Sequence, residues 1–378
     1  MGGTLAALAL LWAAGCGETR PPELRIGLVG IYEGTMAGSS GIPAKMGADL
    51  AVAEINAAGG VTINGRPHTI VLIERETPPR PDAAASVVQS LINLDSVDAI
   101  IGPQTSALAI PAGAVAEAAG VPMIAPMASN AMVTAGRRFV TRLAFVDAFQ
   151  GAVLAGFAYD SLGIRRAAVL HDAASPYGRE ISELFASTFT RRGGQIVAME
   201  TFDADAPRDH SPQLRRILAG GPEAILLPSF VVYDSAQIRI ARSLGFRGRF
   251  LGTDSWDLLP MMRRDDALGS VVVANWDRRT QRDAAREFTN LWLDTYGELP
   301  RATGAATYDA VHLLALAVHR AGRRSGGAVM DSLRRHGRYE GALTSYEFNG
   351  TGDPRRGAVL LEVLRDSTRV RSQADPRR

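Results

Sequence analysis

Short apolar segments alternate with helical patterns along this chain, and the alternation constrains the fold more than any other feature. The first apolar runs typical of buried strands are residues 23–31, 69–73, 99–102 and 121–125. The helical patterns between them are residues 44–58, 81–92 and 106–119. Strands and helices that alternate in this way are typical of a parallel sheet covered on both faces. The first third of the chain therefore predicts one doubly wound α/β domain.

The same pattern then starts again. The second set of strand-like segments is 166–171, 195–202, 224–227, 249–251 and 271–274. The helical segments beside them are 149–162, 178–191, 212–218 and 234–244, and a further strong helix is expected over 303–321. A chain of 378 residues exceeds what one hydrophobic core usually organises. We therefore expect two α/β lobes of similar design.

The N-terminus has the features of an export signal. Residues 5–14 form a short apolar run, too short for a membrane span, and small residues lead to Cys16, the only cysteine. We expect a signal peptide over 1–15, lipidation of Cys16 and a lipid-anchored linker over 16–23. Ala13 stands where a lipidation motif usually has Leu, and no Lys or Arg precedes the apolar run, so an ordinary secretory peptide is the alternative. At the other end, residues 365–378 are expected to form a flexible tail.

Composition and motifs argue against several classes of function. The 41 basic and 39 acidic side chains are nearly balanced and scattered, which is not typical of a protein that binds nucleic acid. The first strand is not followed by the glycine spacing of a dinucleotide site, and no phosphate-binding loop or nucleophile elbow occurs. The six histidines lack companions at metal-ligand spacing. We expect a binding protein with no cofactor and no metal, and not an enzyme.

Two predicted strand ends are followed by loops rich in small hydroxyl residues. These loops are residues 103–106 and 126–130, and they include Thr105, Ser106 and Ser129. Ligands of doubly wound sheets bind outside the carboxyl ends of the strands. Ser106 begins a predicted helix, where free backbone N–H groups favour an anion. Ser106 is therefore a candidate for binding a carboxylate, although a serine there can equally be a helix cap.

Several ordered motifs carry a family resemblance. They are the helix ending 54–61 (EINAAGGV), Ile101-Gly102-Pro103 with Ser106, Gly120-Val121-Pro122 with Ser129-Asn130, and His171-Asp172 with Tyr177-Gly178. In this order and spacing the chain resembles, over residues 24–364, the leucine/isoleucine/valine-binding protein family. These proteins are the type I periplasmic receptors of branched-chain amino-acid ABC transporters.

The resemblance implies an α/β fold of the type I periplasmic binding protein class, with two doubly wound parallel-sheet lobes joined by a three-strand hinge. Lobe 1 would comprise residues 24–145 plus 278–343, and lobe 2 residues 146–277 plus 344–364. The chain would cross between the lobes near 143–147, 274–277 and 344–348.

The resemblance also implies roles for single residues. The ligand's carboxylate would be bound by Ser106, by the main chain of Ala128 and Ser129 and by the Ser129 hydroxyl. Tyr177 would reach across the cleft from lobe 2. Asp254 would pair with the ligand's ammonium group, because a buried ammonium needs a charged partner. Phe230 or Tyr233, in a segment of uncertain register, would face the cleft. Trp256 would form a pocket wall, although a tryptophan in the core is an equal alternative.

The resemblance finally implies a function. The chain would be an extracytoplasmic binding lipoprotein that delivers a small polar ligand, an amino acid of the branched-chain type, to the permease of an ABC transporter. Ser40 stands where some relatives have an aromatic ring over the ligand, so an amide, urea or a small carboxylic acid stays open. An exported sensory or regulatory protein on the same fold is the other alternative.

Overall fold

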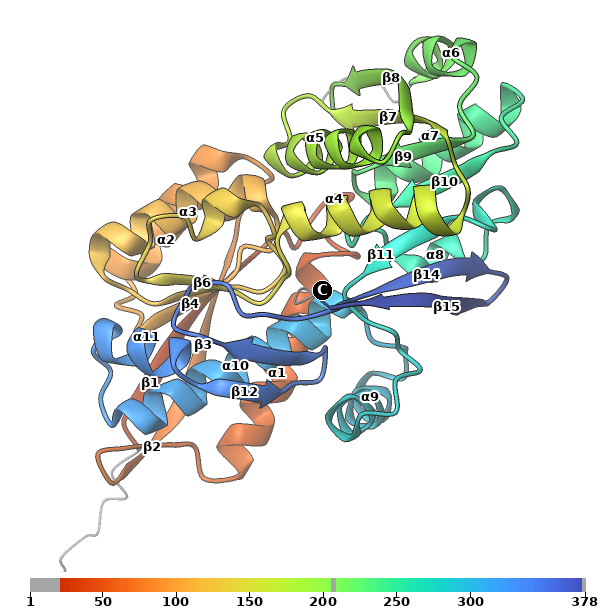
Figure 1. Ribbon diagram of the computed structural model, residues 1–378. Coiled ribbons are helices and arrows are strands. Elements are labelled where there is room, and N and C mark those ends of the chain that lie inside the picture. The colour runs from red at the N-terminus through yellow and green to blue at the C-terminus, as the bar shows by residue number, and fades with distance from the viewer. Residues whose placement is uncertain (1–20, 205–208, 376–378) are drawn as a thin grey trace, which may run out of the picture.

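The chain forms two α/β lobes that lie side by side and are joined by three connecting segments (Figure 1). The structure is a computed structural model, and it describes residues 21–204 and 209–375. Each lobe is built on its own mainly parallel sheet with helices on both faces. The predicted fold class is therefore confirmed. Cys16 and the signal peptide expected over 1–15 lie outside the described residues.

The sheet of lobe 1 has six strands in the order β2-β3-β1-β4-β5-β6. All neighbours are parallel except the pair β2–β3. The strands are β1 (Glu23–Gly30), β2 (Val61–Ile63), β3 (Arg66–Glu76), β4 (Ala99–Ile101), β5 (Met123–Ala125) and β6 (Val140–Arg142). Strands β4 and β5 are apolar throughout because helices cover both of their faces.

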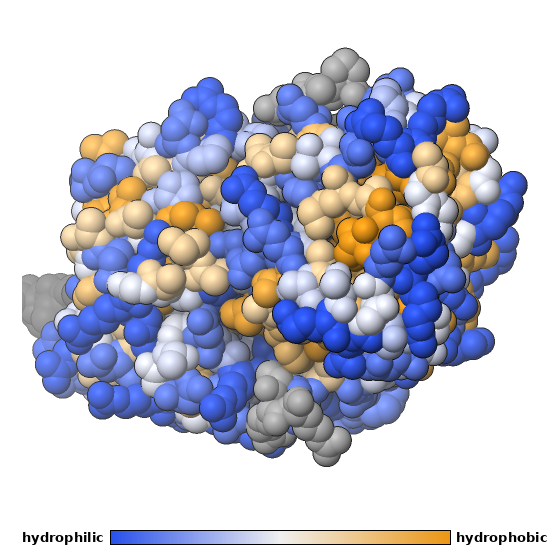
Figure 2. All heavy atoms as spheres, turned by 45° about the horizontal axis from the view of Figure 1, so that its top comes forward, coloured by the Kyte–Doolittle hydropathy of each residue, from blue (hydrophilic) through white to orange (hydrophobic). Residues whose placement is uncertain are grey.

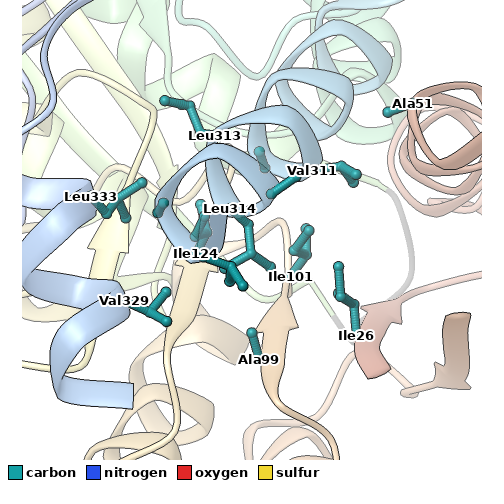
Figure 3. Packing of buried hydrophobic residues seen from close by; sticks show 14 of the residues in the cluster. Ile26, Ala51, Ala99, Ile101, Ile124, Val311, Leu313, Leu314, Val329 and Leu333 are labelled. Atoms are coloured by element: carbon teal, nitrogen blue, oxygen red, sulfur yellow. The ribbon is translucent and has the colours of Figure 1, made fainter. Parts of the chain in front are cut away.

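One face of this sheet is covered by α1 (Gly41–Ala57), α10 (Ala302–Ala321) and α11 (Gly326–Arg334). The other face is covered by α2 (Pro81–Asn93) and α3 (Ser106–Ala119). Figure 3 shows side chains of α10, such as Val311 and Leu314, against Ile26, Ile101 and Ile124 of the strands. Helix α9 (Asp283–Tyr296) packs Phe288 and Trp292 against α1 and α10. The late helix predicted over 303–321 thus belongs to lobe 1.

The sheet of lobe 2 has seven strands in the order β15-β14-β11-β10-β9-β7-β8. Strands β7 to β11 are parallel, whereas β14 and β15 are antiparallel to their neighbours. The strands are β7 (Arg166–Asp172), β8 (Gln195–Phe202), β9 (Ala224–Leu227), β10 (Arg249–Gly252), β11 (Val271–Ala274), β14 (Ala358–Leu364) and β15 (Ser367–Ala374).

Helices cover both faces of the second sheet as well. One face packs against α4 (Asp147–Gly156) and α5 (Pro176–Arg191), and the other against α6 (Ser211–Ala219), α7 (Val231–Ser243) and α8 (Leu258–Met261). Alternate strand residues separate the two cores, since Val169 lies in the first and Leu170 in the second. The remaining short helical turns are η1 (Ala131–Val133), η2 (Phe157–Ser161) and η3 (Asp265–Ala267).

The third crossing between the lobes lies later in the chain than expected. Residues 344–348 were placed in lobe 2, but β13 (Ser345–Phe348) pairs with β12 (Gly337–Glu340) in a hairpin. Tyr346 and Phe348 of this hairpin are buried in the core of lobe 1. Up to Asp353 the chain still bonds to lobe 1, through Thr134 and Arg142. The crossing therefore follows Asp353 and ends where β14 begins.

The expected flexible tail also differs from the structure. Ser367–Ala374 forms the edge strand β15, which pairs along β14. Its charged side chains are compatible with an edge position, because Arg371 bonds to Glu362 of β14 at 2.9 Å. The apolar strand β14 would otherwise expose its backbone donors and acceptors along that edge.

The face shown in Figure 2 carries hydrophobic residues in separate groups among hydrophilic ones. The large hydrophobic side chains that are exposed belong to different elements, for example Leu94 at the end of α2 and Met132 in η1. Within residues 21–204 and 209–375, the helices lack the combination of length and apolar character that crossing a membrane requires.

Candidate functional site

A cavity of about 120 Å³ lies between the two lobes. Its walls come from lobe 1, from lobe 2 and from the crossing that follows β11. Of the predicted ligand residues, those that line it are Thr105, Ser106, Ser129, Tyr177, Phe230, Asp254 and Trp256. The structure thus brings together predicted residues from five separate segments of the chain around one small space.

The lobe 1 side of the cavity is formed by the loop after β4 and the first turn of α3. Gly102 turns the chain there with φ of +92°, and a Cβ atom at this position would lie 2.2 Å from the carbonyl oxygen of Val29. Only glycine fits this turn, which carries Thr105 and Ser106 to the cavity. Thr105 precedes α3 without capping it through its side chain. The first backbone N–H groups of α3 therefore remain available to an anion.

Ser106 and Ser129 stand close together on this side. The Ser106 hydroxyl accepts a hydrogen bond from the backbone N–H of Asn130 at 3.2 Å, which ties α3 to the loop after β5. The Ser129 hydroxyl is buried near the Asp147 carboxyl, and no well-aligned hydrogen bond engages it within the described part of the chain. Ala128, which was expected to bind through its main chain, is not among the lining residues, and its side chain packs in the core of lobe 1.

Asp254 lies on the opposite side, at the end of β10, and three side chains orient its carboxylate. Oδ1 accepts from the Tyr177 hydroxyl at 2.7 Å and from Gln150 Nε2 at 3.1 Å, and Oδ2 accepts from Asn275 Nδ2 at 2.8 Å. Burial raises the pKa of Asp254, and these three hydrogen bonds oppose the rise. A carboxylate offers about four acceptor positions, so one remains for a ligand.

The aromatic residues of lobe 2 divide into two groups. Tyr177 and Phe230 stack with ring centroids 6.2 Å apart and together wall the cavity beside Asp254. Trp256 borders the cavity but also packs in the core, and its indole N–H donates to the Leu227 carbonyl at 3.1 Å. Phe230 therefore faces the cavity, whereas Tyr233 packs against Phe202, away from it. Trp256 is thus both a wall of the cavity and part of the core of lobe 2.

A second carboxyl group, that of Asp147, shares a hydrogen-bond donor with Asp254. Asp147, the first residue of α4, accepts a hydrogen bond from Gln150, the side chain that also bonds Asp254. Burial raises the pKa of Asp147 well above its usual range, and the nearby charges of Asp254 and Glu180 raise it further. Of the two carboxyl groups that share the Gln150 amide, Asp147 is therefore the more readily protonated.

Direct contacts between the lobes hold this arrangement closed. Arg301, before α10 in lobe 1, bonds to Asp257 of lobe 2 at 3.0 Å. On another edge, Glu180 of α5 accepts from the Asn130 side chain at 2.5 Å and from the Ala131 backbone at 3.2 Å. The crossings themselves are joined by Arg356, which donates to the carbonyl oxygens of Leu143 and Asn275.

Several residues of the site could not be foreseen as such. Gln150 and Asn275 orient Asp254, and Gln104, Trp276 and Arg278 line the cavity. Signals were present for three of them. Gln104 lies in the loop 103–106, and Asn275 and Trp276 lie in the crossing expected at residues 274–277. The partnership of Gln150 with Asp254 joins positions 104 residues apart and had no local signal.

Comparison with known families decides what this fold and site represent. Residues 23–367 match the model of the family described as periplasmic binding protein. The chain belongs to the periplasmic binding protein family. Members of this family bind substrates for transporters of the ABC type, and the predicted resemblance to leucine/isoleucine/valine-binding proteins is confirmed.

Relatives of this periplasmic binding protein have related names. An amino acid binding protein of Pseudomonas aeruginosa is 28% identical over 66% of this chain and 65% of its own length. A Leu/Ile/Val-binding protein homolog of Brucella melitensis is 23% identical over 92% of this chain and 93% of its own length. The alignment with the second relative thus includes both lobes.

Solved structures agree with these matches. A leucine binding protein of Thermotoga maritima superposes with a TM-score of 0.87 at 28% identity, over 94% of this chain and 99% of the other. A branched-chain amino acid transporter substrate binding protein of Streptococcus pneumoniae, solved in complex with isoleucine, gives 0.82 at 26% identity, over 93% and 99%. A solute binding protein of Rhodopseudomonas palustris in complex with 3,4-dihydroxybenzoic acid also gives 0.82, but at 22% identity, which shows the shared fold alone.

Proposed function

We propose that this periplasmic binding protein is the extracytoplasmic, lipid-anchored receptor of an ABC transporter and that it closes its two lobes around one α-amino acid. The observation that carries the proposal is the state of Asp254. It is a partly buried carboxylate, held by three hydrogen-bond donors, on the wall of the interlobe cavity.

An ammonium group is the ligand feature that suits Asp254 best. The carboxylate is held in place before any ligand arrives, and burial makes its negative charge costly, as the raised pKa indicates. A cation at its free acceptor position would offset that cost through a charge-assisted hydrogen bond. Tyr177 fixes the direction of approach, because its hydroxyl already occupies one side of Oδ1.

The other end of an amino acid suits lobe 1. Ser106 and Ser129 line the same cavity as Asp254, next to the uncapped first turn of α3. Hydroxyl and backbone N–H donors at a helix N-terminus favour a carboxylate. A zwitterion would then connect an anion site on lobe 1 with a cation site on lobe 2, and binding would stabilise the closed arrangement.

The anchor and the partner rest on the sequence and on the family. Cys16, in its setting of small residues, supports lipidation, and the family supports delivery to a permease. Replacing Cys16 with Ala should move the protein from the membrane fraction to the soluble fraction and leave ligand affinity unchanged. A membrane-bound mature protein that retains residues 1–15 would contradict the anchor.

A thermal-shift screen tests the ligand class. The panel should contain L-amino acids, their deaminated analogues, amides, urea, and aliphatic and aromatic acids. Large shifts in melting temperature are expected only from L-amino acids. A ligand present at 100 times its Kd stabilises the folded state by about 2.7 kcal/mol, which such a shift would report. Shifts from benzoates or urea, with none from amino acids, would contradict it.

A further inference from the structure

The wall of the cavity contains buried polar atoms that have no partner within residues 21–204 and 209–375. They include Gln104 Nε2 and Oε1, Trp276 Nε1 and Arg278 Nη1. Gln104 is only 6% exposed and Trp276 only 7%. Buried polar groups in native proteins are nearly always hydrogen-bonded. So many unpaired groups around one cavity therefore indicate that the ligand supplies their partners.

The backbone carboxylate and the ammonium of an amino acid would leave these three side chains unsatisfied. In the proposed arrangement Ser106, Ser129 and the start of α3 bind the ligand's backbone carboxylate, and Asp254 binds its ammonium group. Gln104, Trp276 and Arg278 present three unpaired donors, of which one is cationic. Their partner must then be a further part of the ligand.

The charges along the cavity support the same conclusion. Asp257 is paired with Arg301 at 3.0 Å, and Asp277, which follows Trp276, lies 3.6 Å from Arg279. Arg278 makes no such pair in the described part of the chain, and its Nη1 is buried. Asp257 and Asp277 attract its charge, but within the described residues neither bonds to it. A carboxylate on the ligand would give Arg278 a bonded counterion.

We propose that the bound amino acid has an acidic side chain, whose carboxylate accepts hydrogen bonds from Arg278, Trp276 and Gln104. The inference rests on the proposed amino-acid receptor and names its substrate class. A carboxylate suits this set because it only accepts hydrogen bonds and can pair with a guanidinium through two of them. An aliphatic side chain would leave all three donors buried and unpaired.

Calorimetric titration of the full chain with L-glutamate, L-aspartate, L-glutamine and L-leucine tests the inference. An acidic amino acid should bind about 100-fold or more tightly than L-leucine, because each buried donor left unpaired costs about 10-fold in affinity. Arg278→Gln should weaken L-glutamate binding about 100-fold and change L-leucine binding less than threefold. The matched control is Arg279→Gln at the next residue, whose side chain is 56% exposed, and it should keep the preference for the acidic ligand.

A second variant covers the case in which Arg278→Gln fails to fold. Gln104→Leu removes two unpaired polar atoms and should weaken L-glutamate binding while it strengthens L-leucine binding. If L-leucine binds the wild type more tightly than both acidic amino acids, or L-glutamine binds as tightly as L-glutamate, the inference is overturned and the amino-acid receptor stands. If none of the four ligands binds while urea or a benzoate does, the proposed function itself fails.

Discussion

Arg356 is the residue on which the joint between the lobes depends most directly. It lies in the third crossing and is 3% exposed. Its guanidinium donates to the Leu143 carbonyl of the first crossing at 3.0 Å and to the Asn275 carbonyl of the second at 2.7 Å. The same group lies 5.2 Å from the ring centroid of Phe145 and 5.7 Å from that of Tyr346. One side chain thus joins all three crossings.

The cost of replacing Arg356 with Met can be worked out from these contacts. Each buried carbonyl that loses its charged donor costs about 1–3 kcal/mol, which gives about 2–6 kcal/mol for the pair. The lost ring contacts add about 1 kcal/mol. Removing a buried charge recovers part of this loss, since burial lowers the pKa of Arg356 and nearby Asp254 and Asp309 only oppose that change. We expect a net loss of about 2–4 kcal/mol in the free energy of unfolding.

Urea denaturation of Arg356→Met, followed by circular dichroism, measures this loss. The neighbouring Arg355 is exposed, so Arg355→Met is the matched control and should change the free energy of unfolding by less than about 0.5 kcal/mol. A loss below about 1 kcal/mol for Arg356→Met, or equal losses for the two variants, would refute the view that Arg356 joins the crossings.

Three further predictions follow from buried and interlobe groups. Burial raises the pKa of Asp309 from 3.8 to about 6. Between these pH values the folded state binds more protons than the unfolded state. The protein therefore loses about 3 kcal/mol of stability as the pH rises from 3.8 through about 6. In denaturation series from pH 4 to 7, Asp309→Asn should lack this dependence, and parallel curves for variant and wild type would contradict it. Glu180→Ala removes interlobe hydrogen bonds outside the cavity. In calorimetry it should weaken the binding of every ligand by the same factor, about 5- to 30-fold. A change in ligand preference would count against this role of Glu180. X-ray scattering should show a smaller radius of gyration with saturating ligand, and identical curves would argue against closure.

Much of the site was predictable because its residues follow strands. In doubly wound sheets the loops after the strands meet at one edge, so Ser106 and Ser129 could be proposed from their positions in the sequence. Asp254 and Tyr177 were proposed through the family resemblance. The residues that orient them were not predictable, because Gln150 and Asn275 reach Asp254 only through the packing of α4 and the second crossing against β10.

The C-terminal part of the fold shows where sequence patterns are insufficient. The alternation of Tyr346, Glu347 and Phe348 is typical of a strand, but the lobe to which this strand belongs depends on its pairing with β12. The β12 sequence, GRYE, has little apolar character, so nothing local indicated that partner. Strand β15 was missed for a similar reason, because its polar residues resemble a tail until β14 pairs with them.

The most direct test of the account compares the wild type and Asp254→Asn, each titrated with the tightest-binding L-amino acid and with its deaminated analogue. The wild type should favour the amino acid by several hundred-fold or more, since an unpaired buried carboxylate costs about 3–5 kcal/mol. In Asp254→Asn this preference should fall below tenfold, because the amide carries no charge for the ammonium to neutralise. Equal affinity of the wild type for the two ligands would contradict the claim that Asp254 recognises an ammonium group.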